Sequence, residues 1–159
     1  KLQIYARFVI KILRLIPKAG GAVMPVIEEL IKVEKDGSIS FGNYELDTKA
    51  KLDNFDVNGD IYKVKTFNEI TKLEENGNFV YESVPGTAVN GFTADDSSVK
   101  FFVEGNDDAQ ITLGLEADTD YKVLVDSVVI GNMKTNISGK LSLSVELSGR
   151  PVKVEVNRM

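Results

Sequence analysis

The chain has 159 residues, of which 43% are apolar and 27% charged, which suits one globular domain or two small ones. Cysteine, histidine and tryptophan are absent from the sequence. Their absence excludes disulfides, thiolate and imidazole metal sites, cysteine nucleophiles and histidine general bases. The sequence also lacks a P-loop and the G-x-G-x-x-G and G-x-S-x-G motifs. No cofactor is therefore predicted.

The charge is divided unevenly along the chain. Residues 1–23 contain five basic residues and no acidic one, whereas residues 24–159 contain 14 basic and 24 acidic residues, a net charge of −10. An acidic body of this kind repels nucleic acid and anionic lipid. Nucleic acid is therefore not an expected partner.

Residues 1–23 have basic and apolar side chains at helical spacing, which predicts a short cationic amphipathic helix that ends near Pro17. The basic positions are Arg7, Lys11, Arg14 and Lys18, and the apolar ones are Ile4, Phe8, Ile12, Leu15 and Ile16. Three interpretations remain open: a signal peptide, a membrane-surface helix, and a segment outside the mature protein with translation starting at Met24. A membrane partner is expected only if this segment belongs to the protein. A start at Met24 predicts a cytoplasmic protein.

The next part of the chain carries three hairpin signals. Asp36-Gly37, Asn58-Gly59 and Asn76-Gly77 each lie between two runs with strand character, and such dipeptides favour tight type I′ turns. The first of these runs, Val26–Glu34, also fits helical spacing, but the turn that follows favours a strand. We expect a region of β-hairpins over residues 24–86.

Alternation of apolar and polar residues becomes regular after the Pro85-Gly86 dipeptide. The apolar positions lie two residues apart in each run: Val99, Phe101 and Val103; Ile111, Leu113 and Leu115; Tyr121, Val123 and Val125; Leu141, Leu143, Val145 and Leu147; Val152, Val154 and Val156. Strands that recur about every ten residues are typical of a β-sandwich. The sequence therefore predicts an all-β protein, in which an immunoglobulin-like β-sandwich over residues 87–159 follows the hairpins.

Three stretches resemble a family of short proteins from anaerobic Gram-positive gut bacteria that often carry the label endosialidase. They are KVKTFNEITKLEENGNFVYESVPGTAV (63–89), DAQITLGLEADTDYKVLVD (108–126) and MKTNISGKLSLSVEL (133–147). Residues 121–156 also resemble the immunoglobulin-like accessory modules of carbohydrate-active enzymes. The resemblance implies a bacterial, carbohydrate-associated protein, and its label implies a glycoside hydrolase that acts on sialic acid polymers.

The residues themselves do not support that hydrolase activity. Sialidases hold the substrate carboxylate with clustered arginines and use a tyrosine nucleophile, whereas residues 24–159 contain only Arg150 and Arg158. The body is also too short for a propeller of several four-stranded blades. We expect a chain without catalytic residues.

Four aromatic residues, Tyr44, Tyr62, Phe79 and Tyr81, are candidates for a carbohydrate-binding platform, although alternating aromatics on strands also serve as core residues. No metal site is predicted, because the acidic stretch Asp56–Asp60 lacks the glycine and glutamate positions of a calcium loop. Phe101 and Phe102 are consecutive and so point to opposite faces, which indicates a second contact surface.

Together these features favour a small non-catalytic β-protein, a binding or structural module. Exposed strand edges invite pairing with another chain, so a homo-oligomer is expected. The alternatives are a carbohydrate-associated accessory protein and, third, an endosialidase-type glycoside hydrolase.

Overall fold

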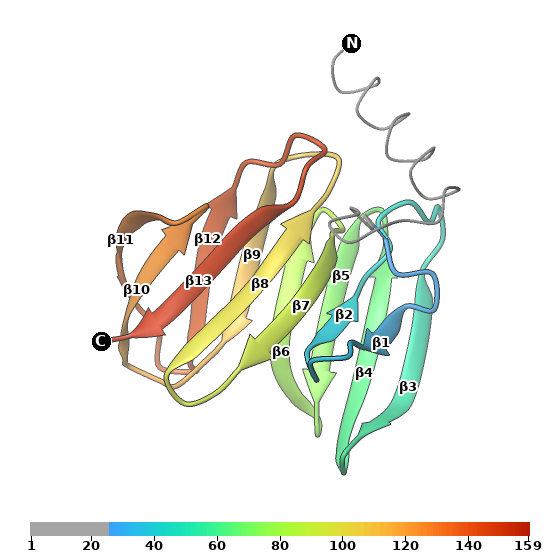
Figure 1. The fold of residues 1–159 in the computed structure, drawn as a ribbon, viewed down its shortest axis with the longest axis horizontal. Coiled ribbons are helices and arrows are strands. Elements are labelled where there is room, and N and C mark those ends of the chain that lie inside the picture. Colours follow the sequence, from blue (N-terminus) through green and yellow to red (C-terminus); the bar gives the residue numbers. More distant parts are fainter. Residues whose placement is uncertain (1–25) are drawn as a thin grey trace.

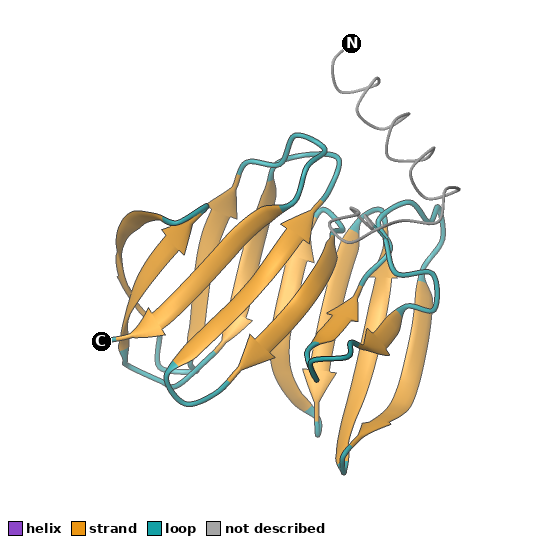
Figure 2. Cartoon of the chain, viewed as in Figure 1, coloured by secondary structure: helices purple, strands orange, loops and turns teal. Residues whose placement is uncertain are grey.

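The computed structural model describes residues 26–159, and the expected helix over residues 1–23 lies outside them. The described residues form 13 strands and no helix (Figures 1 and 2). Every strand pairing between them is antiparallel, and the strands make a sheet of seven and a sheet of six. The prediction of an all-β sandwich is therefore confirmed.

Sheet A holds seven strands and sheet B holds six. In spatial order, sheet A contains β1 (Ile31–Val33), β2 (Ile39–Phe41), β7 (Ala88–Ala94), β8 (Ser98–Glu104), β13 (Val152–Arg158), β10 (Asp120–Val125) and β11 (Val128–Lys134). Sheet B contains β12 (Lys140–Val145), β9 (Ala109–Gly114), β6 (Asn78–Val84), β5 (Ile70–Glu75), β4 (Asp60–Phe67) and β3 (Ala50–Val57).

The three predicted hairpins are present. Asn58-Gly59 joins β3 to β4 and Asn76-Gly77 joins β5 to β6, and all four of these residues have positive φ, as a type I′ turn requires. Asp36-Gly37 lies in the turn between β1 and β2. The strand expected over Val26–Glu34 is shorter than predicted, because the amide of Leu30 donates to the carbonyl of Ile27 in a turn before β1 begins.

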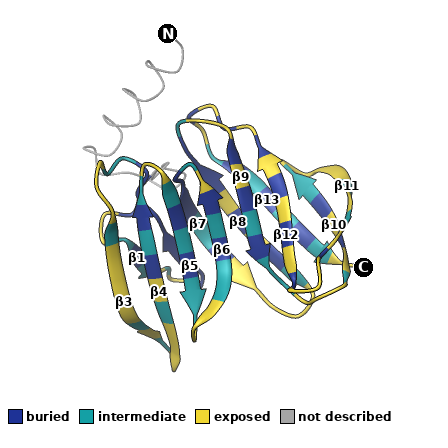
Figure 3. Ribbon diagram, turned by 180° about the vertical axis from the view of Figure 1, so that it is seen from behind, coloured by how far each residue is buried: buried dark blue, intermediate teal, exposed yellow. Residues whose placement is uncertain are grey.

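The alternation expected between residues 99 and 156 also holds. The apolar members of β9, β12 and β13, and Val99, Phe101 and Val103 of β8, are buried between the sheets (Figure 3). Their polar neighbours are exposed or half-buried, except Glu104 at the end of β8, which is buried. Of the two consecutive phenylalanines, Phe101 is buried in the core and Phe102 is 45% exposed on the outer face of sheet A. A shallow hollow beside Phe102 is lined by residues of the β1–β2 hairpin and β7.

Strands from both sides of residue 86 build one sandwich. In sheet A, β2 pairs with β7, and in sheet B, β6 pairs with β9. Phe41 from the first part packs against Phe92 from the second, and Tyr81 packs against Phe101, with ring centroids 5.9 and 5.7 Å apart. The two predicted regions, 24–86 and 87–159, therefore share a continuous hydrophobic core.

Candidate functional site

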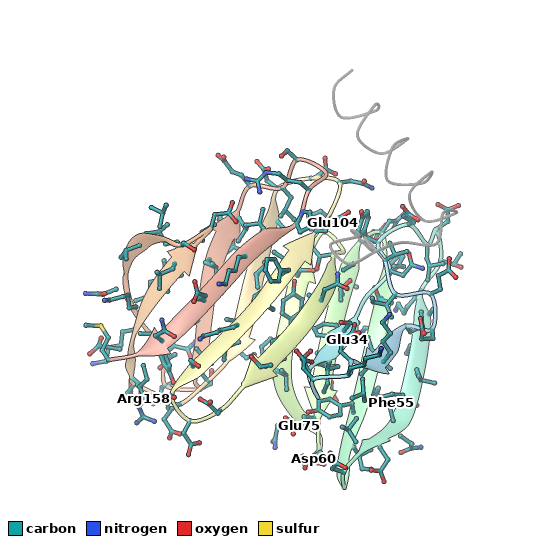
Figure 4. The ribbon with its side chains drawn as sticks, viewed as in Figure 1. Glu34, Phe55, Asp60, Glu75, Glu104 and Arg158 are labelled. Carbon is teal, nitrogen blue, oxygen red and sulfur yellow. The ribbon has the colours of Figure 1, made fainter. Side chains whose placement is uncertain are left out.

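Two of the four aromatics proposed for carbohydrate binding lie inside the protein. Tyr44 is 5% exposed and Tyr81 is fully buried. The Tyr44 hydroxyl lies 3.4 Å from Oε2 of Glu104, which is itself buried near the upper end of β8 (Figure 4). Burial raises the pKa of Tyr81 well above its usual range. These two rings belong to the core and are not accessible to a ligand from solvent.

Tyr81 instead takes part in a buried network of hydroxyl groups. Its Oη lies 2.8 Å from Oγ1 of Thr87, which is 2.7 Å from Oγ of Ser83. Nearby, Oγ1 of Thr71 lies 2.8 Å from Oγ1 of Thr66 and donates to the carbonyl of Thr87 at 2.8 Å. Buried hydroxyls that bond each other are stabilising, whereas an isolated one is costly. The network fixes the passage of the chain from sheet B to sheet A between β6 and β7.

The other two aromatics lie on opposite faces of sheet B. Tyr62 pairs across the strands with Phe55 and packs at the margin of the core, near the end of the sheet where Figure 4 also places Glu75. Burial raises the pKa of Tyr62 to about 12, with a further contribution from the charge of Glu75 and a hydrogen bond to its carboxylate. Phe79 faces outward, where the ammonium groups of Lys140 and Lys72 lie 4.7 and 6.0 Å from its ring centroid. The structure therefore brings none of the four candidates together on one accessible platform.

Phe79 does line a groove of about 460 Å³ between the end of the β5–β6 hairpin and strands β9 and β12. Its polar lining includes Glu75, Asn76, Asn78 and Lys140. Volumes in this range are typical of small-molecule sites. Phe79 is thus a proposed aromatic that lines a groove of ligand size.

Sheet B carries a further cluster on its outer face, which we call the lysine cluster: Lys49, Lys51, Lys63, Lys65 and Lys72. Three of these side chains stand in direct register, because Lys51 on β3 is opposite Lys65 on β4, and Lys65 is opposite Lys72 on β5. Together with Glu74 they line a hollow of about 110 Å³. Five lysines and one glutamate give this lining a formal charge of +4.

Within residues 26–159, Lys72 is the one member of the cluster that forms a salt bridge, at 3.6 Å to Glu74. Glu82 on β6 is the cross-strand neighbour of Lys72 on its other side. Like charges directly opposite each other destabilise a pair of strands. The lysine cluster therefore has an energetic cost that the packing of the sheet does not require.

Sequence reasoning missed the lysine cluster. The five lysines lie at positions 49, 51, 63, 65 and 72, and their alternation on single strands was visible. Their juxtaposition depends on the register of β3, β4 and β5, which places positions 14 and 7 residues apart side by side. The Lys65–Lys72 pair follows from the two-residue connection Asn68-Glu69 between β4 and β5. The Lys51–Lys65 pair depends on a register shift between Leu52 and Phe55, which the Asn58-Gly59 turn does not predict.

Strand β11, at the free edge of sheet A, exposes apolar side chains. Val128, Val129 and Ile130 are 64%, 54% and 46% exposed. Ile130 is the extra residue where the pairing with β10 shifts register. No charged residue and no proline lies between Val128 and Met133. This edge thus lacks the side chains that keep strands apart in most proteins.

The remaining acidic candidates serve turns. Oδ1 of Asp56 accepts a hydrogen bond from the amide of Gly59 at 2.9 Å, and Oδ1 of Asp60 accepts one from the side-chain amide of Asn76 at 3.1 Å. In the part of the chain that the structure describes, acidic side chains form no group of three that could hold a metal ion. Carboxylates engaged in turn hydrogen bonds at the surface lack the burial that general acids use.

Comparison with known proteins gives no relative for this chain. No protein-family model matches it, and no curated protein and no solved structure shows a significant match. Over residues 26–159, no helix is long and apolar enough to cross a membrane.

Proposed function

We propose that the chain is a non-catalytic β-sandwich module that associates with a second copy of itself through strand β11. The observation that carries this proposal is the exposure of Val128, Val129 and Ile130 on an uncharged edge strand. Exposed apolar residues on a sheet edge are unfavourable in water and become favourable once another surface covers them.

The two ends of the sandwich differ in how their edges are protected. At one end, β1 has only three residues and β3 carries charges and a register shift near Asn54, where φ is positive. At the other end lie β11 and β12, as Figures 1 and 3 show. The apolar part of β11 carries none of those charges. Short strands, charges and bulges are the usual means of preventing edge association. Strand β11 also has a bulge, at Ile130, but it has seven residues and its apolar part is uncharged, so the β11 end is the favoured contact.

A second copy is the occupant that this surface fits. The stretch from Val128 to Met133 has no charge, so the same stretch of another molecule can lie antiparallel beside it without facing like charges. The bulge at Ile130 increases local twist and limits a long ladder of hydrogen bonds. We therefore expect a small, concentration-dependent interface dominated by side chains at the tip of the β10–β11 hairpin.

The test is sedimentation analysis of the full chain over a wide range of concentration. Wild type is expected to dimerise, and V129K/I130K is expected to remain monomeric. V33K is the matched control, because Val33 is an apolar strand residue with 44% exposure on β1, at the opposite end of sheet A. A monomeric wild type, or a dimer that survives V129K/I130K, would refute association through β11.

The second candidate function is that of a carbohydrate-associated accessory protein, and the groove at Phe79 favours it. The groove combines an aromatic ring with amide and charged groups, the pairing that saccharide sites use, although Lys140 lies over the ring. The stretches that resemble the endosialidase-labelled family and immunoglobulin-like accessory modules support the same proposal. Binding of bacterial glycans that is lost in F79A and kept in F102A would support it, and equal loss in both would contradict it.

A further inference from the structure

We propose that the lysine cluster on the outer face of sheet B binds a compact oxyanion with two or more negative charges. The cluster lies on β3, β4 and β5, with Lys49 directly before β3, at the end of sheet B opposite β12. The inference is therefore independent of association through β11.

The register of the three strands supports a binding role. Lys65 stands between Lys51 and Lys72, with a like charge directly opposite on each side. The same face also holds two acidic residues: Glu74 is opposite Lys63, and Glu82 is opposite Lys72. Exchanging Lys51 for a polar residue would relieve part of the repulsion without loss of packing, since its side chain is exposed on the solvent side of the sheet. An anion bound between the lysines removes the repulsion in another way and gains charge-assisted hydrogen bonds.

The shape and charge of the hollow narrow the ligand to a compact one. Its volume of about 110 Å³ has room for one or two phosphate, sulfate or carboxylate groups. A long polyanion such as nucleic acid would extend beyond the cluster onto a body with a net charge of −10. Lysine presents a flexible point charge with three donors, which suits oxyanions of varied geometry. The shared chemistry is therefore that of a phosphate- or carboxylate-bearing small molecule.

Substitution of Glu74, an acidic residue within the cluster, is expected to strengthen anion binding. Its carboxylate lies 3.6 Å from the ammonium of Lys72 and opposes Lys63 across the strands, so it competes with the ligand for both lysines. Replacement by glutamine removes the competing charge and keeps the size of the side chain. E74Q is therefore expected to bind the anion more tightly than wild type, a gain that a damaged fold would not produce.

The experiment uses isotope-labelled full-length chain, titrated with pyrophosphate in one arm and citrate in the other, with sodium chloride of matched ionic strength as the reference. Saturable shifts of the amide signals of residues 49–51, 63–65 and 72 are expected in at least one arm. The two arms distinguish a phosphate source from a carboxylate source. Wild type that shows no saturable shift in either arm overturns the proposal.

Variants then test the assignment by calorimetry. K51Q/K65Q/K72Q is expected to weaken binding at least about tenfold, because each hydrogen bond to a charged group contributes strongly. The matched control K100Q/K122Q/K153Q removes three exposed or half-buried strand lysines from sheet A and should bind like wild type. Equal weakening in both variants, or undiminished binding in K51Q/K65Q/K72Q, places the anion elsewhere and overturns the proposal. If K51Q/K65Q/K72Q does not fold, the test is the affinity of E74Q for the anion. If E74Q does not bind more tightly than wild type, the proposed site is refuted.

Discussion

Replacing Thr87 by valine tests whether the buried hydroxyl network stabilises the fold. Thr87 is fully buried where the chain leaves sheet B for sheet A. Its Oγ1 lies 2.8 Å from the hydroxyl of Tyr81 and 2.7 Å from that of Ser83. Valine has nearly the same volume but no hydroxyl, so the substitution leaves two buried hydroxyls without this partner and opens little space.

The expected cost follows from those two hydroxyl groups. A buried polar group that loses its partner costs about 1–3 kcal/mol, and the added methyl group returns about 0.8 kcal/mol if it packs well. For two hydroxyl groups, we expect T87V to lower the free energy of unfolding by about 1–5 kcal/mol, a substantial part of the 5–15 kcal/mol typical of a domain. Combining T87V with Tyr81→Phe should recover part of the loss, because the second change removes one of the stranded hydroxyls.

Urea unfolding followed by circular dichroism measures this difference. The matched control is Thr112→Val, which removes a hydroxyl that bonds Ser142 at 2.9 Å on the exposed outer face of sheet B. Water can replace that bond, so T112V should change stability by less than about 0.5 kcal/mol. If T87V costs no more than T112V, or if Tyr81→Phe makes T87V worse, the reasoning about the network is refuted.

Three further substitutions test other features. Lys65→Glu places an acid between two lysines and should stabilise the chain by about 0.5–1 kcal/mol in urea unfolding; a loss of stability would contradict the account of the cluster. Gly114→Ala should cost about 1–3 kcal/mol in the same assay, because a Cβ there overlaps the carbonyl oxygen of Phe79; an unchanged midpoint would show that β9 can move. The backbone amide of Lys153, with a smaller contribution from an arginine, lowers the pKa of Asp126 below 3.8. This contribution to stability is present above that pH and is lost as the pH falls through the lower folded pKa. Asp126→Asn should therefore flatten the acid side of a plot of melting temperature against pH, and a parallel curve would argue against it.

Much of the architecture could be predicted from the sequence, since its causes are local. The turn signals at Asn58-Gly59 and Asn76-Gly77 located two hairpins, because few residues other than asparagine and glycine accept the positive φ that these turns require. The alternation in β8, β9, β12 and β13 identified the buried faces correctly. The change of pattern after Pro85-Gly86 does not separate two hydrophobic cores. Strands from the two sides of this dipeptide pair with each other, and such long-range pairing leaves no signal in the local sequence.

The candidate sites could be predicted less well, for the same physical reason. Whether an aromatic on a strand is buried depends on what the opposite sheet places over it. Tyr81 lies under sheet A, and Phe79, two residues earlier, faces outward because of a register shift between β5 and β6. The hydroxyl groups that bond Tyr81 were in the sequence, but nothing local indicated that Thr87 would meet them.

The position of β13 has a consequence for how the protein is made. This strand is the last of the thirteen in sequence order, yet it lies between β8 and β10 within sheet A. While the ribosome is still synthesising residues 152–158, β8 and β10 have no neighbour on that side, and each presents an open ladder of amides and carbonyls. A nascent or prematurely terminated chain that lacks only these residues loses the join between the two halves of the sheet. The native topology of sheet A therefore cannot form before residues 152–158 have been synthesised, and products truncated before them are expected to be captured by chaperones or to aggregate.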